Sequence, residues 1–204
     1  MEEQKSKNYR ITSIKIINDS LLQITVDSLN TFYLRKNYLE KQNIIFDVEE
    51  ELSQEEFEDC LNAGLTFTVE KKAMEYLAKT EQSRFLLKNK LKKKEHPIFA
   101  IEKSLDYLEL KGYLNDSRYA MAFLRNRSIS HFEGRNRLLQ ELLQRGVEKK
   151  IAQEQINFFF EEKDEIEICK KALEKLRRIG KKEEKIPSTL EKLGFSYRVI
   201  REIL

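Results

Sequence analysis

From Lys71 to Leu204 the hydrophobic pattern of the chain repeats three times. When three segments are aligned on Glu95, Gly146 and Gly194, which are 51 and 48 residues apart, apolar residues fall at the same offsets in each. The shared columns include Leu87, Leu138 and Ile186; Leu91, Leu142 and Leu190; Ile101, Ala152 and Ile200; and Leu105, Ile156 and Leu204. Their spacings of three and four residues on both sides of the marker predict a helix, a turn and a second helix. A period near 50 residues with one apolar code is typical of a repeat array.

One more helix is predicted before each of these pairs. Its apolar residues are Ala73 and Leu77 in the first repeat, and Ala172 and Leu176 in the third. In the middle repeat it lies around Tyr119 and Phe123. We therefore predict three three-helix repeats, over residues 71–113, 114–162 and 163–204. A single irregular helical bundle with chance similarity is the alternative, and the columns shared by all three copies favour the repeats.

The first 66 residues have a different pattern. Ile14 and Ile16, then Leu22, Ile24 and Val26, then Phe32 and Leu34 alternate with polar residues, which predicts a small antiparallel meander. Ser53 and Glu56 have the spacing of a capping box and begin an acidic helix, which we expect to end at Gly64. Residues 66–70 then form a short connection to the repeats. The predicted fold class is mainly α: an elongated array of three tandem three-helix repeats, preceded by a small N-terminal β-meander plus helix.

Charge is distributed unevenly along the chain. Residues 1–70 hold 7 Lys/Arg against 14 Asp/Glu, whereas residues 71–204 hold 31 against 21. A basic helical body attracts anionic partners at long range. The alternative is an ordinary solvated helical surface.

The candidate partner-binding residues are the clustered cations of the first two repeats. Arginine suits bidentate pairing with carboxylate or phosphate, and a lysine run attracts phosphate. The alternative for each is a surface ion pair that contributes little, and Arg118, near Asp116, is the one for which a structural role is most expected. The set consists of Arg84, Lys90, Lys92, Lys93, Lys94, Arg118, Arg125, Arg127, Arg135, Arg137 and Arg145.

The sequence contains no recognisable catalytic site. It has neither a dinucleotide-binding nor a Walker glycine pattern, and no ligand set surrounds His96 or His131. Cys60 and Cys169 have no metal-site or disulfide spacing. We therefore expect a protein that is not an enzyme and that needs no cofactor or metal, with a carboxylate-dependent nuclease as the weaker alternative. No membrane span or signal-peptide core is evident, so we expect a soluble, cytoplasmic monomer.

Three motifs in this sequence resemble those of the RecX regulatory proteins. The run Gly112–Ala120, GYLNDSRYA, looks like the signature G-Y-L-[DN]-D-x-R-[FY]-A of that family. The segment Gly134–Val147 is similar to its second hallmark, and Ala73–Leu77 with Ser83–Leu87 is similar to its first-repeat opening. The resemblance covers about Lys71 to Leu204. The chain departs from the family pattern at Thr80–Gln82, where an extra arginine is usual, and at Glu95–His96, where Gly-Phe is usual.

This resemblance implies a regulator of recombination, DNA repair and the SOS response. RecX proteins are tandem three-helix repeats that bind the RecA recombinase, lodge in the groove of its filament on single-stranded DNA, and typically inhibit its recombinase, ATPase and co-protease activities. Some also bind single- or double-stranded DNA directly. The alternative function is a DNA-binding helical protein that acts independently of RecA.

Overall fold

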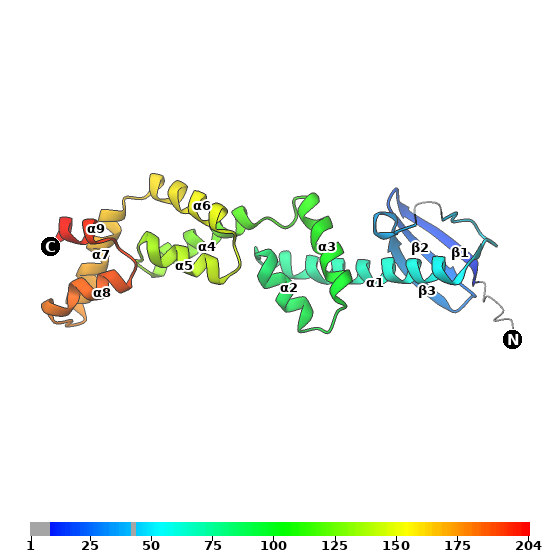
Figure 1. The fold of residues 1–204 in the computed structure, drawn as a ribbon, viewed down its shortest axis with the longest axis horizontal. Coiled ribbons are helices and arrows are strands. Elements are labelled where there is room, and N and C mark those ends of the chain that lie inside the picture. Colours follow the sequence, from blue (N-terminus) through cyan, green and yellow to red (C-terminus); the bar gives the residue numbers. More distant parts are fainter. Residues whose placement is uncertain (1–8, 42–43) are drawn as a thin grey trace, which may run out of the picture. The chain divides into compact units, whose positions relative to one another are not determined.

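The structure is a computed structural model that describes residues 9–41 and 44–204, so the extreme N-terminus examined for a signal peptide lies outside the described residues. The chain forms two compact units (Figure 1). The first comprises the residues up to Lys79 together with Lys88–Tyr113, and the second comprises Thr80–Leu87 and Leu114–Leu204. The bounds of the four predicted domains remain a prediction.

The first unit begins with an antiparallel sheet. Its strands are β1 (Tyr9–Asn18), β2 (Leu21–Val26), β3 (Asn30–Arg35) and the short β4 (Glu51–Leu52), in the order β3-β2-β1-β4. A 3-10 turn, η1 (Lys36–Tyr38), follows β3. The three-stranded meander is confirmed, and β4 is an addition that the pattern did not predict. Alternation buries Ile11, Ile24, Val26 and Leu34 completely, whereas Ile16 at the end of β1 is 72% exposed.

The helix after the capping box does not end at Gly64, so that prediction was wrong. Helix α1 (Gln54–Leu77) is continuous, and the expected connection at residues 66–70 is helical. A Cβ at Gly64 would lie 2.9 Å from the ring of Phe32 and 3.2 Å from the Tyr33 carbonyl oxygen. This glycine therefore permits close approach of α1 to β3 rather than a turn. In Figure 1 the first half of α1 lies against the sheet, and its second half packs on α3.

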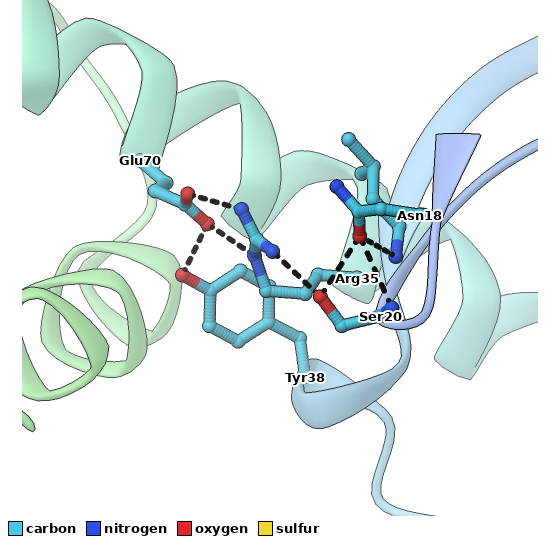
Figure 2. A network of polar contacts seen from close by, with 6 residues as sticks. Asn18, Ser20, Arg35, Tyr38 and Glu70 are labelled. Atoms are coloured by element: carbon cyan, nitrogen blue, oxygen red, sulfur yellow. Dashed lines mark hydrogen bonds and ion pairs between the residues drawn. The ribbon is translucent and has the colours of Figure 1, made fainter. Parts of the chain in front are cut away.

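A buried polar network joins the sheet to α1 (Figure 2). The Arg35 guanidinium donates from Nε and Nη2 to the Glu70 carboxylate at 2.8 and 2.6 Å, and the Tyr38 hydroxyl donates to the same carboxylate at 2.7 Å. Arg35 Nη1 also donates to the Ser20 hydroxyl at 2.9 Å. Because Glu70 lies on α1, this network requires the helix to continue beyond Gly64.

The remaining chain is helical, and the mainly α fold class with a small N-terminal sheet is confirmed. In chain order the helices can be assigned to the three predicted groups. Helices α2 and α3 complete the first group with the end of α1. Helices α4 to α6 form the second group, and α7 to α9 form the third, together with the 3-10 turn η2. Their bounds are α2 (Arg84–Lys92), α3 (Ile98–Leu110), α4 (Asp116–Ser130), α5 (Arg135–Gln144), α6 (Lys149–Glu162), α7 (Glu165–Arg178), η2 (Glu183–Lys185), α8 (Ile186–Lys192) and α9 (Tyr197–Ile203).

In the second unit, the starts of two helices pack against turns that come later in the chain. The start of α2 sits on the turn after α5, where the Ser83 hydroxyl donates to the Arg145 carbonyl at 2.6 Å. The start of α5 sits on the turn after α8, where the Gly134 amide donates to the Leu193 carbonyl at 2.9 Å. The Asn136 amide adds a bond of 3.1 Å to the Gly194 carbonyl. At the start of α5, backbone amides that lack partners within the helix thus donate to the carbonyls of the turn after α8. At the start of α2 the contact is made by the Ser83 hydroxyl instead.

The three aligned marker residues share one backbone conformation. Gly146 and Gly194 have φ of 76° and 93°, and Glu95 has φ of 60°. Glycine is required at the two joints, because a Cβ would lie 2.2 Å from Phe85 Cβ at Gly146 and 2.3 Å from the Arg137 amide nitrogen at Gly194. An L-residue at Glu95 still adopts the left-handed region, which is strained for a residue with a Cβ.

Replacing Glu95 with Gly is therefore expected to stabilise the first unit by about 0.5–1 kcal/mol, the left-handed strain less the larger entropy of glycine in the unfolded chain. Thermal melting of the two proteins measures the change. The control is Lys94→Gly, because Lys94 directly precedes Glu95 but does not have a positive φ. This change is expected to lower the melting temperature. A lower melting temperature for both variants would contradict the prediction.

Candidate partner-binding surface

The lysine cluster, defined as Lys90, Lys92, Lys93 and Lys94, occupies the last turn of α2 and the residues after it. All four residues are exposed. Lys90 and Lys92 lie within α2, and Lys93 and Lys94 lie in the turn that follows it. Cations at a helix C-terminus are also favoured by the helix dipole, which gives them a structural role as well. One carboxylate, Glu95, follows directly. The cluster is a compact cationic surface that phosphate groups can approach from solvent.

Most of the predicted arginines of the middle repeat are engaged within the second unit. Arg127 makes a bidentate bond to Glu133, with Nε at 2.7 Å from Oε2 and Nη2 at 3.1 Å from Oε1. Arg137 Nη2 lies 3.1 Å from Glu141, and Nη1 of Arg145 donates to the same carboxylate. The side chains of Glu133 and Glu141 are only 6% and 13% exposed. These arginines therefore neutralise nearly buried carboxylates.

Two further arginines hold elements of the second unit together. Arg135 Nε donates to Glu165 at 2.9 Å and Nη1 donates to Asn157 at 3.0 Å, while its guanidinium carbon lies 4.5 Å from the Phe160 ring centroid. Arg135 thus links α5 to α6 and to the start of α7. Arg118 pairs with Glu81, so its partner differs from the nearby Asp116 considered from the sequence.

Arg84 and Arg125 occupy different surroundings. The Arg84 backbone amide donates to Asp116 Oδ1 at 2.8 Å, which fixes the start of α2 next to the start of α4. Burial raises the pKa of the Asp116 carboxyl, and the Arg84 amide and charge oppose that rise. Arg125 is exposed on α4, and no ion pair or hydrogen bond of its guanidinium is found among the described residues. Arg125 therefore differs from the paired arginines of the middle repeat, and its predicted partner contact stays a prediction.

The ion-pair network of the middle repeat was not predicted from the sequence, although the spacing of its charged residues indicates it. Glu133, Arg137, Glu141 and Arg145 follow one another at intervals of four residues, with alternating charge. On a helix this spacing places each residue next to the following one. The burial of the two carboxylates could not be inferred from this spacing, because it depends on elements that are distant in sequence.

The pairing of Glu141 in this network predicts that the thermal stability of the protein depends on pH. Burial alone would raise the pKa of Glu141, but the Arg145 bond and the charges of Arg145, Arg127 and Arg137 hold that pKa below its ordinary value. A carboxyl whose pKa is lower in the folded state than in the unfolded state stabilises the fold at pH values above its unfolded pKa. This contribution to the free energy of unfolding is lost as the pH falls through the folded-state pKa. From about pH 5 downward, wild type is therefore expected to lose melting temperature more steeply than Glu141→Gln. Glu154→Gln, an exposed change on α6, is the control expected to follow wild type, and parallel profiles for all three would contradict the prediction.

No group of three or more His, Cys, Asp or Glu side chains in residues 9–41 and 44–204 could hold a metal ion. Over the same residues, no helix is long and apolar enough to cross a membrane.

Known proteins are similar to this chain in sequence and in fold. The family model described as RecX, second three-helix domain, matches residues 115–154. Regulatory protein RecX of Treponema pallidum (strain Nichols) is 36% identical over 132 residues, which are 65% of this chain and 80% of the relative. Regulatory protein RecX of Clostridium perfringens (strain 13 / Type A) is 30% identical over 204 residues, covering 96% of this chain and 88% of the relative.

Two solved structures have a similar fold. A crystal structure of regulatory protein RecX matches with a TM-score of 0.76 and 22% identity, over 96% of this chain and 98% of the other. A crystal structure of RecX from Lactobacillus salivarius matches with a TM-score of 0.60 and 22% identity, over 68% of this chain and 94% of the other. On the identity and coverage of its relatives, this chain belongs to the RecX family of regulatory proteins.

Proposed function

We propose that this protein binds the RecA filament on single-stranded DNA and inhibits the recombinase, ATPase and co-protease activities of RecA. Membership of the family supports a regulatory role, and the name of the relatives is regulatory protein RecX. The observation that carries the physical part of the proposal is the exposed lysine cluster on a chain segment with 31 Lys/Arg and 21 Asp/Glu. Such a surface attracts the phosphates and carboxylates of a nucleoprotein filament.

The contacts made by the arginines divide the candidate residues into two groups. Arg127, Arg135, Arg137 and Arg145 are paired with Glu133, Glu141 or Glu165, so a partner would have to displace internal bonds to use them. The lysine cluster and Arg125 are exposed. We therefore assign the partner contacts to the lysine cluster and Arg125. We assign a structural role to the paired arginines, which hold elements of the second unit together.

The experiment is a titration of the protein into RecA hydrolysing ATP on single-stranded DNA. Wild type is expected to inhibit well below one copy per RecA monomer, because a protein lodged in the filament groove blocks growth beyond its own site. The variant Lys92→Gln/Lys93→Gln/Lys94→Gln is expected to need at least tenfold more protein, as roughly three phosphate or carboxylate contacts are lost.

The matched control removes three exposed lysines from the third repeat, as Lys181→Gln/Lys182→Gln/Lys185→Gln. It has the same net charge as the first variant and is expected to inhibit like wild type. Equal loss in both variants would show that total charge, not the lysine cluster, determines binding. If excess wild-type protein left ATP hydrolysis unchanged but still bound DNA, the proposal would fail in favour of a DNA-binding protein that acts independently of RecA.

A further inference from the structure

An aromatic ring lies beside the lysine cluster in the first unit. Tyr76 is near the end of α1 and is partly exposed. The Lys90 ammonium lies 5.5 Å from the centroid of its ring, and the Lys72 ammonium lies 5.6 Å from it. Both distances are within the range of attraction between a cation and an aromatic face. The ring therefore sits among lysines that come from two different helices.

The charges around Tyr76 are mainly positive. The exposed Lys94 lies in the turn after α2, and the exposed Lys79 follows Tyr76 just beyond the end of α1. One carboxylate is adjacent, Glu75, and it is paired with Lys72. An anionic ligand that is drawn to this surface would meet the lysines and the ring together.

We propose that Tyr76 is a stacking site for a base of single-stranded nucleic acid, with the phosphates of that strand on Lys90 and the rest of the lysine cluster. A basic surface with an exposed aromatic ring is the arrangement by which proteins bind single strands without sequence preference. In a duplex the bases are already stacked and paired, so the ring has no free base face to contact. The proposal deepens the proposed function and rests on it for the class of partner.

The alternative is that Tyr76 only packs against the lysine side chains. Long lysine side chains commonly cover apolar surface while the ammonium stays in solvent. The two possibilities differ in a measurable way, because packing does not require that the ring respond to nucleic acid. A stacked base changes the environment of the ring directly.

The first experiment uses the full chain with Tyr76→Trp. The protein contains no tryptophan, so the substituted indole is the sole tryptophan emitter. An oligothymidylate is titrated in, and the same mixtures are followed by the anisotropy of a label on the oligonucleotide. The expected result is quenching of the indole emission that saturates together with the anisotropy. Unchanged emission at saturating oligonucleotide would overturn the proposal.

The second experiment measures affinity. Tyr76→Ala is expected to weaken binding to single strands about tenfold, Tyr76→Phe to leave it unchanged, and neither to alter binding to a duplex. Because Tyr76→Ala removes no charge, the dependence of affinity on salt is expected to keep its slope, whereas Lys92→Gln/Lys93→Gln/Lys94→Gln is expected to make it shallower. Circular dichroism of each variant checks the fold. An equal loss for duplex and single strand would also overturn the stacking site.

These outcomes separate the inference from the proposed function. If the protein inhibits RecA but its isolated chain does not bind the oligonucleotide, the stacking site is wrong and the proposed function stands. If the indole is quenched by the oligonucleotide but RecA is unaffected, the stacking site stands and the proposed function is wrong.

Discussion

Replacing Glu70 with Ala is expected to destabilise the first unit by about 3–5 kcal/mol, because the Arg35 guanidinium is then left charged and without its main partner. The two side chains are only 12% and 8% exposed, so water cannot replace the lost carboxylate. The Tyr38 hydroxyl loses its acceptor as well. Hydrogen exchange measured by mass spectrometry reports the change locally, and peptides from β2, β3 and α1 should exchange faster in the variant.

Two controls show whether the charge is the cause. The triple variant Arg35→Met/Tyr38→Phe/Glu70→Leu removes the three polar groups that meet at the Glu70 carboxylate. It is expected to be much closer to wild type than Glu70→Ala, since apolar groups of similar size replace a buried ion pair. Glu75→Ala breaks an exposed pair with Lys72 on the same helix and should have little effect. If the triple variant were as unstable as Glu70→Ala, loss of packing rather than an unpaired charge would be the explanation.

Replacing Gly194 with Ala is expected to destabilise the second unit by about 2–5 kcal/mol, combining left-handed strain with overpacking. Gly194 has φ of 93°, and a Cβ there would lie 2.3 Å from the Arg137 amide nitrogen. That neighbour is backbone at the start of α5, so relief requires α5 to move away from the turn. The hydrogen bond from the Asn136 amide to the Gly194 carbonyl would be lost with it.

Gly180 provides a control, because it has a similar positive φ but no atom close to the position of a Cβ. Its φ is 74°, and nothing lies within 4 Å of the position of a Cβ. Gly180→Ala is therefore expected to cost about 1–2 kcal/mol from strain alone. Urea unfolding of the two variants gives the difference, which isolates the contribution of the joint. Equal losses would mean that the joint between α5 and α8 adapts without strain.

The functional importance of the middle-repeat arginines changes once their partners are known. From the sequence, six arginines of repeat two and a lysine run formed one cationic set. The structure pairs four of those arginines with Glu133, Glu141 or Glu165, and pairs Arg118 with Glu81. Substituting them would therefore disturb folding and binding together. We propose Lys92, Lys93, Lys94 and Arg125 as better targets for mutation, because these exposed side chains take no part in the arginine pairs with Glu81, Glu133, Glu141 and Glu165.

Short sequence patterns predicted helix ends correctly where residues close together in the chain determine the backbone conformation. The capping box at Ser53 is formed with both of its reciprocal bonds, and Gly146 and Gly194 have positive φ after their helices. In each case the backbone conformation is determined by neighbours within a few residues, so a short stretch of sequence is sufficient.

The interpretation of Gly64 failed because the reason for that glycine lies elsewhere in the chain. A glycine in a helical pattern has the same local appearance whether it ends the helix or makes room for a neighbour. Only the position of Phe32 and Tyr33 against α1 decides between the two. Glu95 is the converse case, since it takes the conformation of the aligned glycines although its residue type does not favour it.

The sequence by itself determined the mainly helical fold class, the three-fold repetition, the N-terminal meander and, through its motifs, the family. These follow from periodicity and from residues close together in the chain. Only the tertiary structure decided that α1 is continuous, that Arg35 and Glu70 meet, that the middle-repeat arginines are paired, and that Tyr76 lies among the lysines. Each of these depends on which faces pack together, and burial and ion pairing arise from contacts that no local pattern specifies.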